Sequence, residues 1–139
     1  MFSVINSTTS QCLIVMPVNG KRFLKSFADA SKGLAYLFRS QFNARVELII
    51  TCLVIIAGIL FKISSSEWVI VLLCIALVLG LEAINTAIEI LADKLHPGSD
   101  PEIGKAKDVA AGAVFVATIL SAVIGLVIFV PYVKDFLMK

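Results

Sequence analysis

Three long runs of apolar residues constrain the fold of this chain more than any other feature. They cover about residues 46–63, 68–92 and 109–133. A bilayer has a hydrocarbon core of roughly 30 Å, which a helix of about 20 apolar residues spans. The first run is marginal in length and requires bilayer thinning or snorkelling at its ends. Since backbone groups inside lipid must pair within their own segment, we predict an all-α protein with three transmembrane helices.

The composition favours a membrane protein and excludes other classes. Of the 139 residues, 59% are hydrophobic and 16% charged, whereas soluble domains are nearer half apolar and a quarter charged. A disordered chain, a disulfide scaffold and an ordinary cytosolic enzyme are therefore excluded. The net charge of +2 is too small to indicate a nucleic-acid partner. Three scattered cysteines and one histidine do not form a zinc-binding pattern.

The residues before the first run divide into two parts. Residues 1–20 carry no charged side chain, and we expect a loosely ordered or surface-lying extension there. Residues 21–139 are expected to form one membrane domain. It begins with basic residues interleaved with apolar ones at helical spacing, which predicts an amphipathic helix on the membrane surface over about residues 22–44. The basic residues are Lys21, Arg22, Lys25, Lys32, Arg39 and Arg45.

Basic residues also predict the orientation. Nine of them lie before the first run or between the second and third, and three lie in the first connection or after the third run. Because lysine and arginine gather on the cytoplasmic side, the N-terminus and the second connection are expected to face the cytoplasm. The chain is thus predicted to be a multi-pass protein of the cytoplasmic membrane.

The second connection has the pattern of a turn followed by a helix start. Asp100 suits an N-cap, Pro101 the first helical position, and Glu102 the positive end of the helix dipole. Lys105 and Lys107 follow, and a helix N-terminus beside lysines suits a polyphosphate. The chain has no Gly-rich Walker sequence, so any nucleotide site here is non-standard.

Four polar residues interrupt the second apolar run. At about 100° per residue, Glu82, Asn85, Glu89 and Asp93 share a stripe under about 90° wide. Carboxylates inside a membrane helix are costly unless paired or hydrated, so they indicate a functional site. Facing acids suit Mg²⁺, which takes one or two carboxylates together with phosphate oxygens. A polar cluster that only holds helices together would not explain three acids on one stripe.

These residues resemble a known signature. The pattern E-x-x-N-[ST]-A-I-E, followed by K-A-K-D, is similar to that of the bacterial prokaryotic-type diacylglycerol kinase/undecaprenol kinase family. The resemblance extends without gaps over about residues 21–133. It implies a small homotrimeric kinase of the bacterial inner membrane, which uses ATP and Mg²⁺ to phosphorylate a lipid alcohol. The matching segments are residues 82–89, Asp93, 105–108, 32–34 and 43–45.

The resemblance also implies roles for single residues. Glu82 would be the general base on the lipid hydroxyl, and Glu89 a ligand of the metal on ATP. Where the family commonly has a second metal-binding glutamate, this chain has Gln41, which is still predicted to contact the metal. The residues implied to hold ATP are Arg22, Asn85, Glu89, Asp93, Gly98, Ser99, Asp100, Lys107 and Asp108.

Glu47 is a possible substitute for the missing carboxylate, although it lies six residues after Gln41. We further predict that the lipid substrate contacts Glu47, Trp68 and Glu82. Undecaprenol is preferred because the third run resembles that branch of the family, and diacylglycerol is the alternative. Two other classes stay open at this point: a non-enzymatic membrane assembly protein, and an ion or proton carrier that uses the carboxylates as relays.

Overall fold

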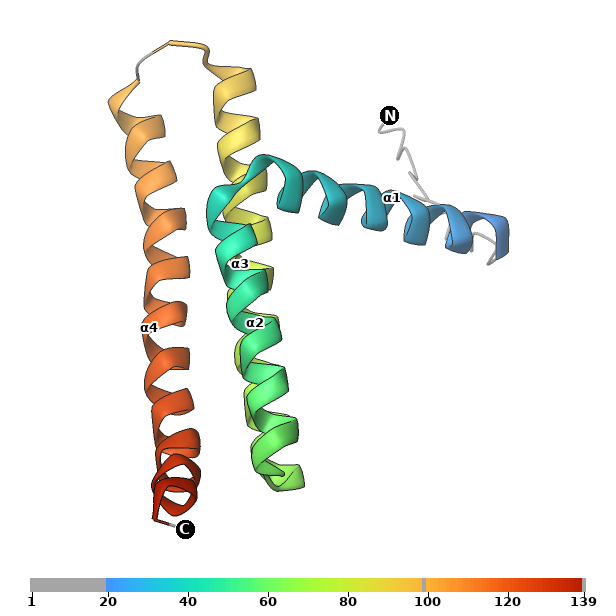
Figure 1. Ribbon diagram of the computed structural model, residues 1–139. Helices are drawn as coiled ribbons and strands as arrows, with labels where there is room; N and C mark the ends of the chain where they lie inside the picture. Colours follow the sequence, from blue (N-terminus) through green and yellow to red (C-terminus); the bar gives the residue numbers. More distant parts are fainter. Residues whose placement is uncertain (1–19, 99, 139) are drawn as a thin grey trace, which may run out of the picture. The chain divides into compact units, whose positions relative to one another are not determined.

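The computed structural model describes residues 20–98 and 100–138, so the expectations for residues 1–19 and for Ser99 lie outside the described residues. The described residues form four helices: α1 (Gly20–Ser40), α2 (Phe42–Phe61), α3 (Ser65–Leu95) and α4 (Pro101–Leu137) (Figure 1). They contain no strand. The all-α prediction is confirmed. The chain divides into two compact units after Lys32, and each is described separately.

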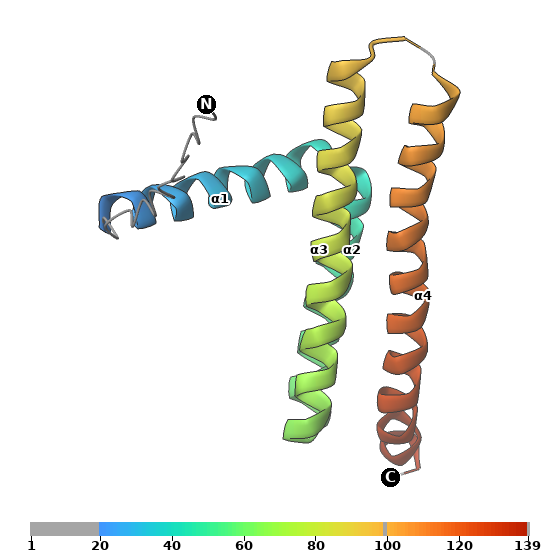
Figure 2. The ribbon, with the colours of Figure 1, turned by 180° about the vertical axis from the view of Figure 1, so that it is seen from behind.

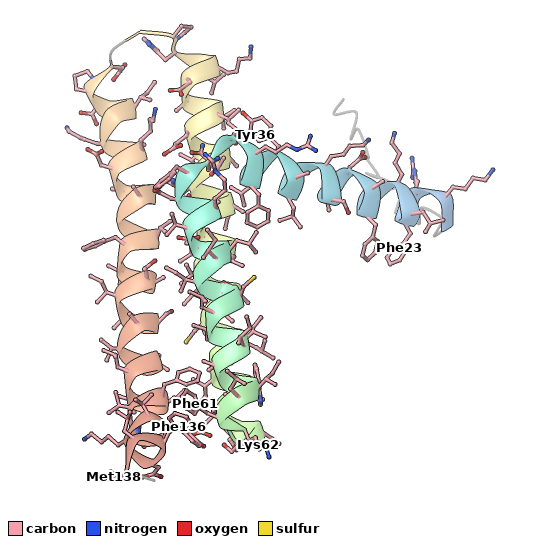
Figure 3. All side chains as sticks on the ribbon, in the orientation of Figure 1. Phe23, Tyr36, Phe61, Lys62, Phe136 and Met138 are labelled. Carbon is pink, nitrogen blue, oxygen red and sulfur yellow. The ribbon has the colours of Figure 1, made fainter. Side chains whose placement is uncertain are left out.

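The first unit contains the N-terminal part of α1. Phe23, labelled in Figure 3, packs edge to face with Phe27. The ring centroids are 5.1 Å apart, and both side chains are largely exposed. Lys32 pairs with Asp29 at 3.2 Å. The predicted N-terminal helix with apolar and charged side chains is therefore present.

The boundary between α1 and α2 differs from the prediction. The surface helix was expected to continue to about residue 44, but it ends at Ser40 because Gln41 has an extended backbone. The N–H of Gln41 still donates to the carbonyl of Leu37 at 2.9 Å. Residues 42–44 begin α2 instead, where Ala44 is fully buried. No glycine or proline stands at the break, so the sequence carried no signal for it.

Helices α2, α3 and α4 are long and apolar enough to cross a membrane, as predicted, with 20, 31 and 37 residues. Helices α3 and α4 extend beyond the apolar runs because polar residues cap them. Ser64 and Glu67 form a capping box at the start of α3. The Asp100 carboxylate accepts hydrogen bonds from the N–H groups of Glu102 and Ile103, which confirms the predicted start of α4.

Helix α3 packs against both α2 and α4, as the two opposite views show (Figures 1 and 2). We call the end of these three helices where Lys62 lies the Lys62 end. There Phe61 lies 6.3 Å from the ring of Phe136 (Figure 3). The hydroxyl of Tyr132 donates to the Glu67 carboxylate at 2.7 Å and so joins α4 to α3. Aromatic packing and this hydrogen bond hold α2, α3 and α4 together at the Lys62 end.

The turn between α2 and α3 depends on a close contact at Gly58. Lys62 adopts a left-handed conformation (φ 54°, ψ 49°), and the N–H of Ile63 returns to the carbonyl of Gly58. A Cβ at Gly58 would lie 2.8 Å from the ring of Trp68. The absence of a side chain at Gly58 therefore lets Trp68 pack on α2.

We expect Gly58→Ala to lower the free energy of unfolding by about 1–3 kcal/mol, the usual cost of overpacking. Thermal unfolding in detergent measures the effect. Gly80→Ala in α3 is the control, because a Cβ there meets nothing within 4 Å. Equal melting temperatures for the two variants would contradict the role of the Gly58–Trp68 contact.

Candidate active site

The polar stripe of α3 is buried among the membrane helices. Glu82 is 2% exposed, Asn85 7% and Thr86 4%, and these are the buried polar residues of the described chain. Glu89 is half-buried and Asp93 exposed, so the stripe runs from the interior of the helices toward the loop that joins α3 to α4. The stripe predicted from the spacing is thus buried from Glu82 to Thr86 and becomes exposed toward Asp93.

Glu89 is held by two amide side chains. The Nδ2 of Asn85 donates to one carboxylate oxygen of Glu89 at 3.2 Å, and the Nε2 of Gln41 donates to the other at 3.5 Å. The helix break at Gln41 thereby places the start of α2 beside the polar stripe of α3. Gln41 and Glu89, the two residues predicted to bind the metal, thus lie within hydrogen-bonding distance of each other.

A second contact joins α3 to α4. The ammonium of Lys107 donates to the Asp93 carboxylate at 2.8 Å. Lys107 lies less than two turns into α4, the helix that Asp100 caps. The positive end of the helix dipole at such a helix start and a nearby lysine attract anions. This end of α3 and α4 is therefore suited to phosphate.

Three carboxylates interact across α2 and α3. Glu47 interacts electrostatically with Glu82, and Glu82 with Glu89. Carboxylates that approach one another in an apolar environment raise the free energy of the protein unless a proton or a cation joins them. The arrangement suits proton transfer at one carboxylate and cation binding at another.

Buried polar atoms without a hydrogen-bond partner also point to a ligand. Within the described residues they are one carboxylate oxygen of Glu47, the side-chain oxygen of Asn85 and the hydroxyl of Thr86. Leaving such an atom unpaired costs about 1–3 kcal/mol. Buried polar groups of native proteins are nearly always paired, so these three indicate groups that a bound molecule contacts.

An apolar cavity of about 480 Å³ lies between α2, α3 and α4. Val71, Ile75 and Val78 line it from α3 and lie on the same face as Glu82, which follows Val78 by about one helical turn. Its polar lining residues are Glu47, Thr51, Thr118 and Ser121. One face of α3 thus changes from apolar to acidic where Glu47 borders the cavity.

Other predicted site residues are placed as follows. Trp68 packs on Gly58 at the Lys62 end, about 21 Å along α3 from Glu82, so the structure does not bring these two together. Asp108 is exposed beside Lys107, and Gly98 is in the loop. Asp100 caps α4, and its Oδ2 lies 3.8 Å from the Nε2 of His96. Arg22 belongs to the first unit, and Ser99 lies outside the described residues.

The oxygen donors around Glu89 fit Mg²⁺ that arrives with a polyphosphate. Glu89 offers a carboxylate, and Asn85 and Gln41 offer amide oxygens after rotation of their side chains. The described residues contain no cluster of three His, Cys, Asp or Glu that would hold a metal by itself. Mg²⁺ is commonly bound through one or two carboxylates together with substrate phosphates and water. The residues therefore fit a metal that the nucleotide helps to bind.

Thr86 and the cavity were not assigned from the sequence. Thr86 follows Glu82 by four residues, which places it about 40° away on the same stripe, and this spacing was the available signal. It received no role because threonine is ordinary in an apolar helix. The cavity depends on how α2 and α4 pack around α3, which no local pattern specifies.

Comparison with known proteins places the chain in a family. The sequence model described as prokaryotic diacylglycerol kinase matches residues 28–129. The undecaprenol kinase of Bacillus subtilis (strain 168) is 41% identical over 110 residues, which are 79% of this chain and 89% of the relative. The diacylglycerol kinase of Synechocystis sp. (strain ATCC 27184 / PCC 6803 / Kazusa) is 36% identical over 109 residues, 78% of this chain and 62% of that relative. The diacylglycerol kinase of Haemophilus influenzae (strain ATCC 51907 / DSM 11121 / KW20 / Rd) is 25% identical over 93 residues, which are 67% of this chain and 79% of that relative.

A fold of three apolar helices with a buried acidic stripe and these similarities define a membrane-embedded enzyme. The chain belongs to the prokaryotic diacylglycerol kinase family. It is a lipid kinase, and membership of this kinase family implies the use of ATP. The predicted family is confirmed, and an enzyme is favoured over the assembly and carrier alternatives.

Proposed function

We propose that this enzyme transfers the γ-phosphoryl group of ATP to the hydroxyl of undecaprenol and so produces undecaprenyl phosphate. The observation that carries the proposal is the continuous face of α3, which lines an apolar cavity and then presents buried Glu82. A hydrocarbon chain in the cavity would bring a lipid hydroxyl to the acidic stripe. The relative named undecaprenol kinase supports this alcohol, and the two named diacylglycerol kinases support diacylglycerol as the second candidate.

Glu82 is the proposed general base. It is buried beside Glu47, which borders the cavity, so a hydroxyl at the end of the cavity meets a carboxylate. Phosphoryl transfer depends mainly on positioning and charge stabilisation, and a carboxylate that accepts the hydroxyl proton suffices as the base. Glu47 is proposed to orient the lipid hydroxyl through its unpartnered oxygen. Trp68 stays a predicted contact of the lipid chain, at the Lys62 end.

Glu89, Asn85 and Gln41 are the proposed residues that hold Mg²⁺, which neutralises charge on the phosphates when bound. Lys107 would contact phosphate oxygens, and its present bond to Asp93 keeps the ammonium at the head of α4. Further proposed nucleotide contacts are Asp93, Asp108, Arg22 and the turn of Gly98, Ser99 and Asp100. Of these groups, Asp93 belongs to the stripe and Asp100 and Asp108 belong to the start of α4.

We also propose that residues 21–139 form one kinase domain in the bacterial inner membrane, with the N-terminus in the cytoplasm. A homotrimer is proposed because the family resemblance implies one. Small residues of α4, among them Ala113, Ser121 and Gly125, form a stripe on which helices can approach closely, either within one subunit or between subunits. Ser121 and Gly125 of this stripe line the cavity of their own subunit, whereas Ala113 is exposed and available to a neighbour.

Glu82→Gln mixed with Lys107→Ala in one membrane tests whether the active sites are shared between subunits. If they are, mixed trimers should regain part of the activity. Crosslinked mixed trimers without regained activity would contradict shared sites.

The direct test uses purified protein in mixed micelles with ATP and Mg²⁺. We expect phosphate transfer to undecaprenol with a higher kcat/KM than transfer to diacylglycerol, because the relative named undecaprenol kinase is 41% identical, against 36% and 25% for the two named diacylglycerol kinases. Product identification by mass spectrometry checks the result. A higher kcat/KM for diacylglycerol would contradict the preferred substrate, and transfer to neither lipid would contradict the function.

We expect Glu82→Gln to lower kcat by about 10²–10⁴-fold, the usual loss when a general base is removed. The KM for ATP should change little, because Glu82 is not proposed to hold the nucleotide. Glu67→Gln, on the same helix at the Lys62 end, is the control and should keep its kcat. Near-normal turnover of Glu82→Gln would remove Glu82 from this role.

We expect Glu89→Gln to raise the Mg²⁺ concentration that gives half-maximal activity, since a metal ligand loses its charge. Gln41→Glu should lower that concentration, because a second carboxylate joins the site. Mg²⁺ titrations at saturating ATP measure both effects, and Asp135→Asn at the end of α4 is the control. Titration curves that overlay the parent curve would contradict the metal assignment.

A further inference from the structure

Thr86 is a buried hydroxyl that the proposed roles leave unused. We propose that its hydroxyl donates a hydrogen bond to a γ-phosphate oxygen of the bound nucleotide. The inference rests on the proposed function, because Glu82 and Glu89 define where the phosphoryl group lies during transfer. It adds to the site a neutral residue that recognises the transferred group itself.

The hydroxyl of Thr86 has an unused hydrogen-bonding capacity. Thr86 is 4% exposed, and its Oγ1 has no hydrogen-bond partner. A threonine inside a helix commonly bonds the carbonyl of the preceding turn, three or four residues back, and thereby satisfies its hydroxyl. Thr86 does not do so. A buried hydroxyl left in this state is destabilising, and a ligand that accepts its proton would remove the penalty.

Thr86 lies between the proposed base and the proposed metal ligand. It follows Glu82 by four residues and precedes Glu89 by three, and side chains at these spacings are neighbours on a helix face. Along the helix axis Thr86 is about 6 Å from Glu82 and about 4.5 Å from Glu89. In-line transfer places the γ-phosphoryl group between the attacking hydroxyl, held by the base, and the metal-bound phosphates. Thr86 lies at the corresponding position along the axis of α3, between Glu82 and Glu89.

A phosphoryl group bound between Glu82 and Glu89 would also need a hydrogen-bond donor on the stripe. Glu82 and Glu89 present carboxylates, and a phosphoryl group between them adds further negative charge. The Nδ2 of Asn85 already donates to Glu89, and the ammonium of Lys107 to Asp93. Among the buried side-chain atoms of the described residues that have no hydrogen-bond partner, the Thr86 hydroxyl is the one that can donate from an uncharged group, because the other two are a carboxylate oxygen of Glu47 and the amide oxygen of Asn85. A threonine χ1 has two populated rotamers in a helix, so rotation can turn the hydroxyl toward a ligand.

The test compares nucleotides with and without a γ-phosphate. The binding of AMP-PNP and of ADP, each with Mg²⁺, is measured by calorimetry for the parent protein, Thr86→Val and Thr86→Ser. We expect Thr86→Val to weaken AMP-PNP binding by about tenfold to hundredfold, the range for a lost hydrogen bond to a charged group. ADP binding should be unchanged. Thr86→Ser should restore AMP-PNP binding, because it keeps the hydroxyl.

Stability provides a second readout. Valine has the shape of threonine, and the hydroxyl has no partner without nucleotide, so Thr86→Val should keep or raise the melting temperature of the nucleotide-free protein. Weaker AMP-PNP binding together with undiminished stability supports the inference. An equal loss of AMP-PNP and ADP binding, or no loss, would overturn it while the proposed function stands. A parent protein that binds neither nucleotide would instead overturn the proposed function and this inference with it.

Discussion

The rest of this structure depends on the cost of placing carboxylates inside a membrane. Glu82 is almost fully buried and interacts with Glu47 and Glu89, although an ionised group in an apolar environment is unfavourable. Protein contacts offset only part of this cost, through the amides of Gln41 and Asn85 on Glu89. A metal ion, a transferred proton and a lipid hydroxyl would offset the remainder. The same buried carboxylates that make the stripe costly would therefore also make it reactive in the proposed transfer.

The second constraint is that one face of α3 is apolar along part of its length and acidic further on. Helix α3 presents Val71, Ile75 and Val78 to the cavity and, one turn later, Glu82. A lipid alcohol is itself divided in this way, into a long apolar chain and one hydroxyl. Under the proposed function, the apolar chain would lie against the apolar part of this face and the hydroxyl would meet the carboxylate of Glu82. Positioning of this kind supplies a large part of the rate enhancement in phosphoryl transfer.

The sequence allowed the helices and the acidic stripe to be predicted because both are local patterns. Apolar runs indicated α2, α3 and α4, and Asp100 with Pro101 indicated where α4 starts. The helix break at Gln41 was missed because it comes from one extended residue without glycine or proline. The cavity was missed because it arises between three helices. Thr86 was missed for a different reason: its hydroxyl matters only once burial and the lack of a partner are known.

Gln41 shows how the break and the chemistry are connected. The extended backbone at Gln41 ends α1 and turns its side chain toward Glu89, so the same residue starts α2 and contacts the proposed metal ligand. An amide at this position costs less to bury than a carboxylate, because it carries no charge. It would also attract a cation less strongly, so in the proposed site Glu89 and the phosphates would supply most of the charge that holds Mg²⁺. The proposed site would therefore be less costly to keep without nucleotide, and metal binding there would depend more on the nucleotide that accompanies the metal.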